Sequence, residues 1–312
     1  MPSHPADHAN KRPHDRADGV VPALAELVAL RGVAQARRPP QRGRHGVNGP
    51  VPSPMRGRGM EYAESREYAR GDDARHVDWR LTARSGRMHT KLFQAERERL
   101  TLIVADTSPA LYFGTRVRFK SVQAARAGAV AAWAAIADGD RVAALRGSDA
   151  EPPVAPAGGT RGALHVLDAL ARWYAHAPPD DAGLDVALAR ARRLLRPGSR
   201  LLVLADAGSL DGVPDAMWPA LTMHHEATVL VIDDALERDP PRQRLPLFGA
   251  GRRVEPDLGS PVQRRGWRDA FSGAAERAAT RLRARGVRVI LLAADAPSQS
   301  WLVPGGPAEA RP

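Results

Sequence analysis

Two aspartates each follow a short apolar run that is typical of a buried β-strand. Asp106 comes directly after residues 100–105, and Asp206 comes directly after residues 201–205. Because the carboxyl ends of parallel strands meet at one edge of a sheet, we expect the two carboxylates to lie close together. With the hydroxyl group of Ser108 they could bind a hard divalent cation such as Mg²⁺. An aspartate after a strand also serves as a helix cap or a turn former, and the pattern leaves both roles open.

Residues 64–92 carry arginines and aspartates at close spacing, together with aromatic residues. The segment is too apolar for a linker and too charged for a core. Arginine and carboxylate side chains can form bidentate ion pairs, so a network of such pairs could hold this irregular segment in place. The alternative is a surface on which a protein partner docks, with the aromatic residues as anchors. The residues concerned are Arg66, Tyr68, Arg70, Asp72, Asp73, Arg75, Asp78, Trp79, Arg80 and Arg84.

Motifs of the common catalytic sites do not occur in the chain. Gly57-Arg58-Gly59 lacks the preceding strand and the third glycine of a dinucleotide-binding loop, and there is no Gly-Lys-Ser/Thr phosphate loop. There is also no Gly-x-Ser-x-Gly elbow of a serine hydrolase. The adjacent His224 and His225 cannot both point at one metal ion from a regular element. We therefore expect a protein that is not an enzyme.

Composition and charge narrow the classes of protein and of partner that remain possible. The longest apolar run, residues 127–137, is too short to span a membrane, and the chain contains no cysteine, so we expect a cytoplasmic protein. The net charge of +11 is concentrated in residues 1–58, which carry ten of the basic and four of the acidic residues. A basic arm of this kind could bind nucleic acid, but aromatic residues do not alternate with its arginines as base stacking would require. Nucleic acid is therefore an unfavoured partner.

From residue 100 onward, apolar strands alternate with helical patterns, which is typical of a doubly wound α/β fold. Apolar residues three or four positions apart predict helices at residues 122–136, 164–174, 184–195 and 267–282. The predicted strands are residues 100–105, 141–145, 201–205, 228–232 and 287–292. We expect a mainly parallel, Rossmann-like sheet. Before it, residues 76–80 and 88–93 have strand character around Ser85-Gly86 and predict an N-terminal β-hairpin extension.

The charged segment and the first strand end together resemble a known bacterial family, the domain-of-unknown-function family 58, whose members look like von Willebrand factor A domains. The resemblance covers most of the chain. The residues that carry it are Arg66 with Tyr68, Gly71-Asp72-Asp73, Arg75, Asp78-Trp79, Thr82-Ala83-Arg84, Asp106-Thr107-Ser108 and, more weakly, Asp206 and Asp234-Ala235-Leu236-Glu237.

The resemblance implies a degenerate form of the metal site of von Willebrand A domains. That site uses Asp-x-Ser-x-Ser, a threonine from a second loop and an aspartate from a third. Asp106 and Ser108 match the first element, and Asp206 matches the third. Ala110 stands where the second serine would be, and residues 180–183 offer no threonine. A divalent cation bound through Asp106, Ser108 and Asp206 is therefore expected to have an incomplete ligand set.

The expected organisation has four parts. Residues 1–20 are expected to be a disordered tail, and residues 21–99 a short helix and the Arg/Asp-rich β extension, packed on the core. Residues 100–303 would form the von Willebrand A-like domain, and residues 304–312 a second disordered tail.

The resemblance also implies a function, because members of this family are often encoded beside MoxR-type AAA+ ATPases. We expect a non-enzymatic interaction or adaptor module that works with such an ATPase on client proteins. Two alternatives remain open: a Mg²⁺- or Mn²⁺-dependent hydrolase using Asp106 and Asp206, and a nucleic-acid binder using the basic N-terminal arm.

Overall fold

The computed structural model describes residues 19–36, 60–95, 99–249 and 252–302. Its contacts divide the chain into two compact units. Residues 40–98 form one of them, called the extension unit below, and the rest of the chain forms the α/β unit. The predicted tails and the irregular segment before residue 60 lie almost entirely outside the described residues, and of the basic arm only residues 19–36 are described. Only Gly19 and Val20 of the predicted first tail are described, and the carbonyl of Gly19 accepts a hydrogen bond from the backbone N–H of Phe119.

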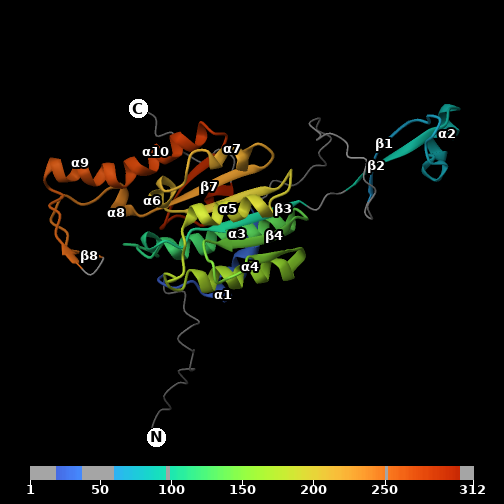
Figure 1. The fold of residues 1–312 in the computed structure, drawn as a ribbon. Helices are drawn as coiled ribbons and strands as arrows, with labels where there is room; N and C mark the ends of the chain where they lie inside the picture. Colours follow the sequence, from blue (N-terminus) through green and yellow to red (C-terminus); the bar gives the residue numbers. More distant parts are fainter. Residues whose placement is uncertain (1–18, 37–59, 96–98, 250–251, 303–312) are drawn as a thin grey trace, which may run out of the picture. The chain divides into compact units, whose positions relative to one another are not determined.

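Helices and strands alternate through the α/β unit (Figure 1). Its helices are α1 (Leu24–Ala36), α3 (Lys120–Ala137), α4 (Gly159–Trp173), α5 (Leu184–Leu194), α6 (Ala207–Asp211), α7 (Met217–Thr222), α8 (Ala235–Arg238), α9 (Pro261–Ala270) and α10 (Ser272–Arg283). Its strands are β3 (Leu100–Ala105), β4 (Arg141–Arg146), β5 (Val154–Ala157), β6 (Arg200–Ala205), β7 (Glu226–Asp233), β8 (Leu247–Gly249), β9 (Arg252–Val254) and β10 (Arg288–Ala293). Among these described helices, none has the length and apolar character needed to cross a membrane.

A six-stranded sheet with the order β10-β7-β6-β3-β4-β5 forms the centre of the α/β unit. All neighbouring pairs are parallel except β4 and β5, which are antiparallel. The prediction of an α/β fold with a mainly parallel sheet is therefore confirmed. The chain leaves β3 toward one side of the sheet and, after β5, returns to β6 on the other side. The strand order therefore reverses between β3 and β6, and the carboxyl ends of strands at such a reversal are where doubly wound sheets bind ligands.

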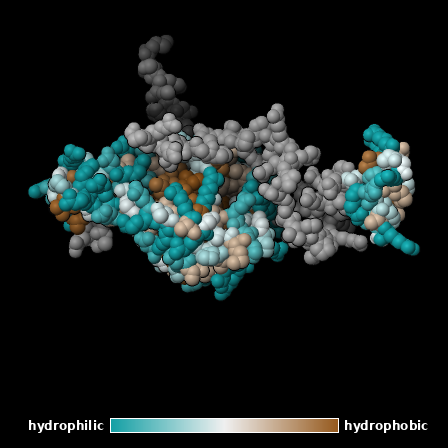
Figure 2. Space-filling model, turned by 90° about the horizontal axis from the view of Figure 1, so that it is seen from above, coloured by the Kyte–Doolittle hydropathy of each residue, from teal (hydrophilic) through white to brown (hydrophobic). Residues whose placement is uncertain are grey.

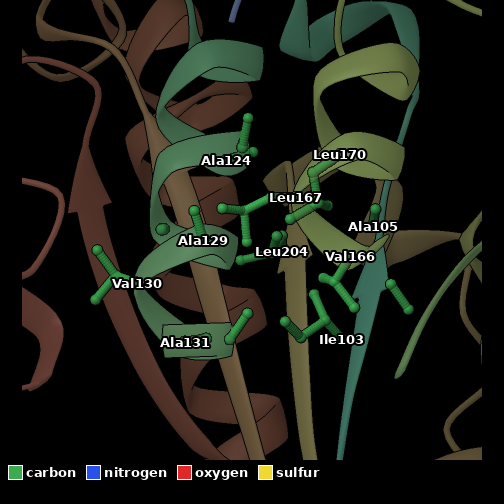
Figure 3. Close-up of a cluster of buried hydrophobic side chains, with 14 of the residues drawn as sticks. Ile103, Ala105, Ala124, Ala129, Val130, Ala131, Val166, Leu167, Leu170 and Leu204 are labelled. Carbon is green, nitrogen blue, oxygen red and sulfur yellow. The ribbon is translucent and has the colours of Figure 1, made fainter. Parts of the chain in front are cut away.

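Side chains of the parallel strands alternate between two cores, one on each face of the sheet. Ile103 and Leu204 face the core formed with α1, α3 and α4. Figure 3 shows their side chains beside Leu167 and Leu170 of α4 and the alanines of α3. Leu102 and Val104 face the second core, formed with α5, α7 and α10. Helices therefore cover both faces, as the continuous apolar runs in the strands require.

Helix α1 belongs to the α/β unit, because it packs on α3. The indole N–H of Trp133 donates a hydrogen bond of 3.1 Å to the carbonyl of Leu27, and Arg31 lies 5.3 Å from the centre of the Trp133 ring. Arg126 of α3 also pairs with Glu26. The predicted segment 21–99 is thus divided between the two units, and the packing of its β extension on the core stays a prediction.

The extension unit contains β1 (Met60–Glu67) paired antiparallel with β2 (His89–Ala95), and between them a short 3-10 helix, η2 (Ala74–His76), and α2 (Trp79–Ser85). A hairpin-like pair of strands is therefore present, but the predicted first strand at residues 76–80 is wrong. The side chain of Asp78 accepts a hydrogen bond from the backbone N–H of Leu81 and starts a helix there. Gly86 ends that helix with φ of 74°, in the left-handed region that glycine adopts readily.

Figure 2 shows that the visible face of the α/β unit is largely hydrophilic, with hydrophobic residues gathered in one area of it. This pattern agrees with the burial of most apolar side chains in the two cores.

Candidate functional site at the carboxyl ends of the strands

Asp106 and Asp206 lie side by side at the carboxyl ends of β3 and β6. The backbone N–H of Asp106 donates to the carbonyl of Leu204 at 2.9 Å, and the backbone N–H of Asp206 donates to the Asp106 carboxylate at 3.0 Å. The neighbouring position of β3 and β6 in the sheet produces this arrangement. The edge formed by these strand ends and the residues that follow them is called the rim below.

Asp106 is buried, and its carboxylate is bound by several donors. It accepts hydrogen bonds from the backbone N–H of Ser108 at 2.9 Å and from the Ser108 hydroxyl at 3.3 Å, in addition to the one from Asp206. Burial raises the pKa of Asp106, and the hydrogen bonds oppose that shift. The hydroxyl of Ser209 donates to that of Ser108 at 2.9 Å, which links β3 to α6. Ser108 is thus part of an internal network around Asp106.

Lys120, the first residue of α3, supplies a positive charge inside the rim. Its side chain is 1% exposed, and its Nζ lies 2.6 Å from Asp206 Oδ2 and 2.6 Å from Glu237 Oε1. Burial by itself would lower the pKa of Lys120, but the two carboxylates outweigh burial and raise it. Burial raises the pKa of Glu237 even though Lys120 acts against that shift. The three side chains form a buried ion-pair cluster that joins α3, β6 and α8.

This arrangement does not fit a divalent cation. The carboxylate of Asp206 already accepts hydrogen bonds from Lys120 and from the backbone N–H of Gly208, so a divalent cation would have to compete with the charge of Lys120 for it. No group of three or more His, Asp or Glu residues in the described part of the chain could hold a metal ion. The amine of Lys120 already supplies the charge that a cation would bring. The metal site at Asp106, Ser108 and Asp206 stays a prediction, and the observed hydrogen bonds do not favour it.

The loop before α5 is where the resemblance to von Willebrand A domains would require a threonine. This loop carries carboxylates instead. The hydroxyl of Thr107 donates to Asp181, whose other oxygen accepts the backbone N–H of Gly183 at 2.7 Å. Next to it, Asp180 pairs with the buried Arg146 at 2.8 Å. These bonds fix the loop before α5 against the end of β3.

Beyond β7 the rim contains two further aspartates. Asp234 caps α8 in a capping box with Glu237 and also accepts hydrogen bonds from Thr115. Asp233 ends β7, and its Oδ1 accepts no hydrogen bond in the described structure. Burial, together with the nearby Glu237, raises the pKa of Asp233 to about 6, although Arg238 opposes the shift.

Sequence reasoning did not identify Lys120, Asp233 or the role of Glu237. One signal was available for Lys120: the chain has only three lysines, and this one opens a helix that is otherwise alanine-rich and apolar. Glu237 lies in the Asp-Ala-Leu-Glu sequence that was noted only for its resemblance.

In the extension unit, most aspartates stabilise the backbone instead of forming a lattice of ion pairs. Asp72 pairs with Arg66 at 2.7 Å, accepts the backbone N–H of Ala69 at 2.8 Å and, through its carbonyl, accepts the Tyr68 hydroxyl at 2.9 Å. The pKa of Asp72 is lowered chiefly by the Ala69 hydrogen bond, with a further contribution from Arg66. Asp73 caps η2 through the backbone N–H of Arg75.

Arginine side chains and one tryptophan are left on the surface of the extension unit. Trp79 is 67% exposed, and Arg75 is 89% exposed with its Nε 4.0 Å from Asp73. Arg70, Arg80 and Arg84 are exposed and form no close ion pair within the described residues. An open hollow of about 370 Å³ is lined by Asp78, Arg80, Leu81, Arg84 and Lys91. The structure thus places most of the predicted charged residues of this segment on one small unit.

The fold and the rim define a doubly wound α/β protein with an added extension unit. A family model described as "Protein of unknown function DUF58" matches residues 64–285, and the chain belongs to this family. The chain is 33% identical over 159 residues to "Uncharacterized protein Mb1516" of Mycobacterium bovis and to "Uncharacterized protein Rv1480" of Mycobacterium tuberculosis. Each match covers 51% of this chain and 49% of the relative, so the chain spans about half the length of these curated relatives. No solved structure matches the chain significantly.

Proposed function

We propose that this protein is a non-enzymatic protein-interaction module and that its partner is a MoxR-type AAA+ ATPase. The observation that carries the proposal is Trp79, which is 67% exposed on the extension unit and lies in a segment with the exposed Arg75, Arg80 and Arg84. Tryptophan and arginine are the residues that most often dominate the binding energy of protein interfaces. The ATPase as partner comes from the family resemblance, and it is part of the proposal.

The α/β unit is proposed to be von Willebrand A-like, with the rim as a degenerate metal-ion-dependent adhesion site. Three features support this assignment: the strand order, the antiparallel edge strand β5, and the aspartates after β3 and β6. In this proposal Lys120 takes the place of the cation, because it binds Asp206 from within the protein. The rim then contributes a preformed surface of fixed charge instead of a reaction centre.

A pull-down with the cognate MoxR-type ATPase tests the proposal. The wild-type chain is compared with Trp79→Ala and Arg75→Ala, and the measured quantity is the fraction of ATPase recovered. Loss of an interface hot spot costs 2 kcal/mol or more, so the Trp79→Ala variant should lower the affinity by about 30-fold.

Two exposed residues of the α/β unit provide matched controls: Met223→Ala, which removes an apolar side chain that is 71% exposed, and Arg161→Ala in α4. Both controls should recover the ATPase as the wild type does. Equal recovery by the wild type and the Trp79 and Arg75 variants, or no recovery by any of them, would contradict the proposed function.

A further inference from the structure

A cavity of about 190 Å³ lies in the rim on the far side of β6 from Asp106. It is formed by the segment after β6, by the end of β7 with α8, and by the junction of α9 and α10. The break between these two helices at Phe271 separates one predicted helix into two and contributes Phe271 to the wall. Val231 and Ala275 add further apolar surface, whereas Asp206, Asp233 and Glu237 supply carboxylates.

Asp233 is the carboxylate of this cavity that the protein neutralises least. It is 8% exposed, and its Oδ1 accepts no hydrogen bond. Its nearest cation is the Nε of Arg238 at 3.4 Å, which is an ion-pair contact without hydrogen-bond geometry. Arg238 is half-exposed and is shared with Asp295, also at 3.4 Å. Oδ1 is itself buried against Arg238, so a ligand that donates hydrogen bonds would have to reach the other oxygen of this carboxylate, Oδ2.

The charges around the cavity indicate which kind of ligand would bind there. Lys120 forms ion pairs with both Asp206 and Glu237, and Arg238 forms ion pairs with both Asp233 and Asp295. Arg118 also interacts with Asp295, so among the described residues these four carboxylates meet three cations, in a chain whose overall charge is +11. The local excess is negative although the protein is strongly basic. A cationic ligand matches this excess, and an anionic one does not.

We propose that this cavity binds an arginine side chain of a protein partner, with the guanidinium facing Asp233. A guanidinium presents several N–H groups in one plane, so it could donate to Oδ2 of Asp233 and to a second acceptor of the cavity wall at once, whereas an ammonium group does not have this planar geometry. The apolar surface of Val231, Phe271 and Ala275 would contact the methylene groups of the arginine stem. The inference that the arginine belongs to a protein partner rests on the proposed function. The binding of an arginine side chain in the cavity can be tested without any partner.

The test is a titration of the ¹⁵N-labelled full chain with N-acetyl-L-arginine amide, followed by NMR at the backbone amides of Gly208 and Ser272, which line the cavity. N-acetyl-L-citrulline amide has nearly the same shape without the charge, and N-acetyl-L-lysine amide has the charge without the planar fork. We expect saturable shifts at both amides with the arginine probe, in the millimolar range of such a small ligand. The lysine probe should bind more weakly, and the citrulline probe should produce no saturable shift.

Asp233→Asn should lower the affinity for the arginine probe by at least about tenfold, because it removes the facing charge. Asp168→Asn is the matched control, since Asp168 forms an ion pair with Arg172 on the exposed face of α4, away from the cavity. A melting curve of each variant verifies that it is folded. Equal shifts with the arginine and citrulline probes, no shift at the lining amides, or unchanged affinity in Asp233→Asn would overturn the inference. The pull-down tests the ATPase partner through Trp79 and Arg75, whereas the NMR titration tests arginine binding through Asp233. A negative result in one experiment therefore leaves the other proposal distinguishable.

Discussion

Replacing Asp233 with asparagine is expected to make the folded protein more stable at neutral and alkaline pH. Asp233 is 8% exposed, and its pKa is raised from 3.8 to about 6, chiefly by burial. An ionised carboxylate at this position is therefore unfavourable in the folded chain relative to the unfolded chain. Asparagine has a similar shape but no charge to bury.

The sign and size of the effect follow from the proton linkage. Between about pH 4 and pH 6 the folded state keeps a proton on Asp233 that the unfolded state has lost, so stability falls as the pH rises through this range. The full cost above pH 6 is about 3 kcal/mol, since each pKa unit corresponds to 1.36 kcal/mol. At pH 5 about half of that cost is present. The pKa of about 6 already includes the opposing effect of Arg238, so the loss of that contact is part of this figure.

Asp233→Asn should therefore be more stable than the wild type by about 3 kcal/mol at pH 8 and by about 1.5 kcal/mol at pH 5. Urea unfolding at both pH values, followed by circular dichroism, measures the free energy of unfolding. Asp168→Asn, which also loses an ion pair to an arginine, should show neither the gain nor its pH dependence. A destabilised Asp233→Asn at pH 8, or a difference that does not change between pH 5 and pH 8, would refute this reasoning.

Lys120→Met should lower the free energy of unfolding by about 3–5 kcal/mol, because it leaves two buried carboxylates without their cation. Urea unfolding tests this, and adding Glu237→Gln to the same chain should restore part of the loss. Gly162→Ala in α4 should lower the melting temperature although alanine favours helices, because its Cβ would lie 2.2 Å from the carbonyl oxygen of Ala157. Gly266→Ala in α9 is its control, since nothing lies within 4 Å of the added Cβ, and it should gain about 0.5–1 kcal/mol. Equal melting temperatures for the two alanine variants would show that the close contact with Ala157 does not destabilise Gly162→Ala.

The strands of the central sheet could be predicted because buried parallel strands need continuous apolar runs. The prediction for β3 has the observed bounds, and those for the other parallel strands differ by one or two residues at an end. Strand β5 was missed, because Val154–Ala157 is short and contains Pro156. Proline is accepted on an edge strand, so the pattern of a central strand does not apply there. In the extension unit, the capping role of Asp78 overrode the strand character of its neighbours.

The approach of Asp106 to Asp206 could be predicted from the sequence, because both follow parallel strands of one sheet. The position of Lys120 could not, since it depends on how α3 begins relative to β6 and α8, and that geometry is set by tertiary packing. The same holds for the cavity beside Asp233, because no apolar periodicity marks the break between α9 and α10. Local sequence thus indicates which residues reach the rim but not which of them neutralise one another.

The electrostatics of the rim are consistent with the binding role proposed above. Lys120 binds Asp206 and Glu237 with short contacts, as a stabilising cluster would. Asp233 differs, because the protein buries it, raises its pKa and leaves one of its oxygens without a donor. Binding sites often retain groups that lower the stability of the free protein, because a ligand can satisfy them. A basic chain that keeps uncompensated negative charge at the edge where doubly wound sheets bind ligands is suited to receive positive charge there.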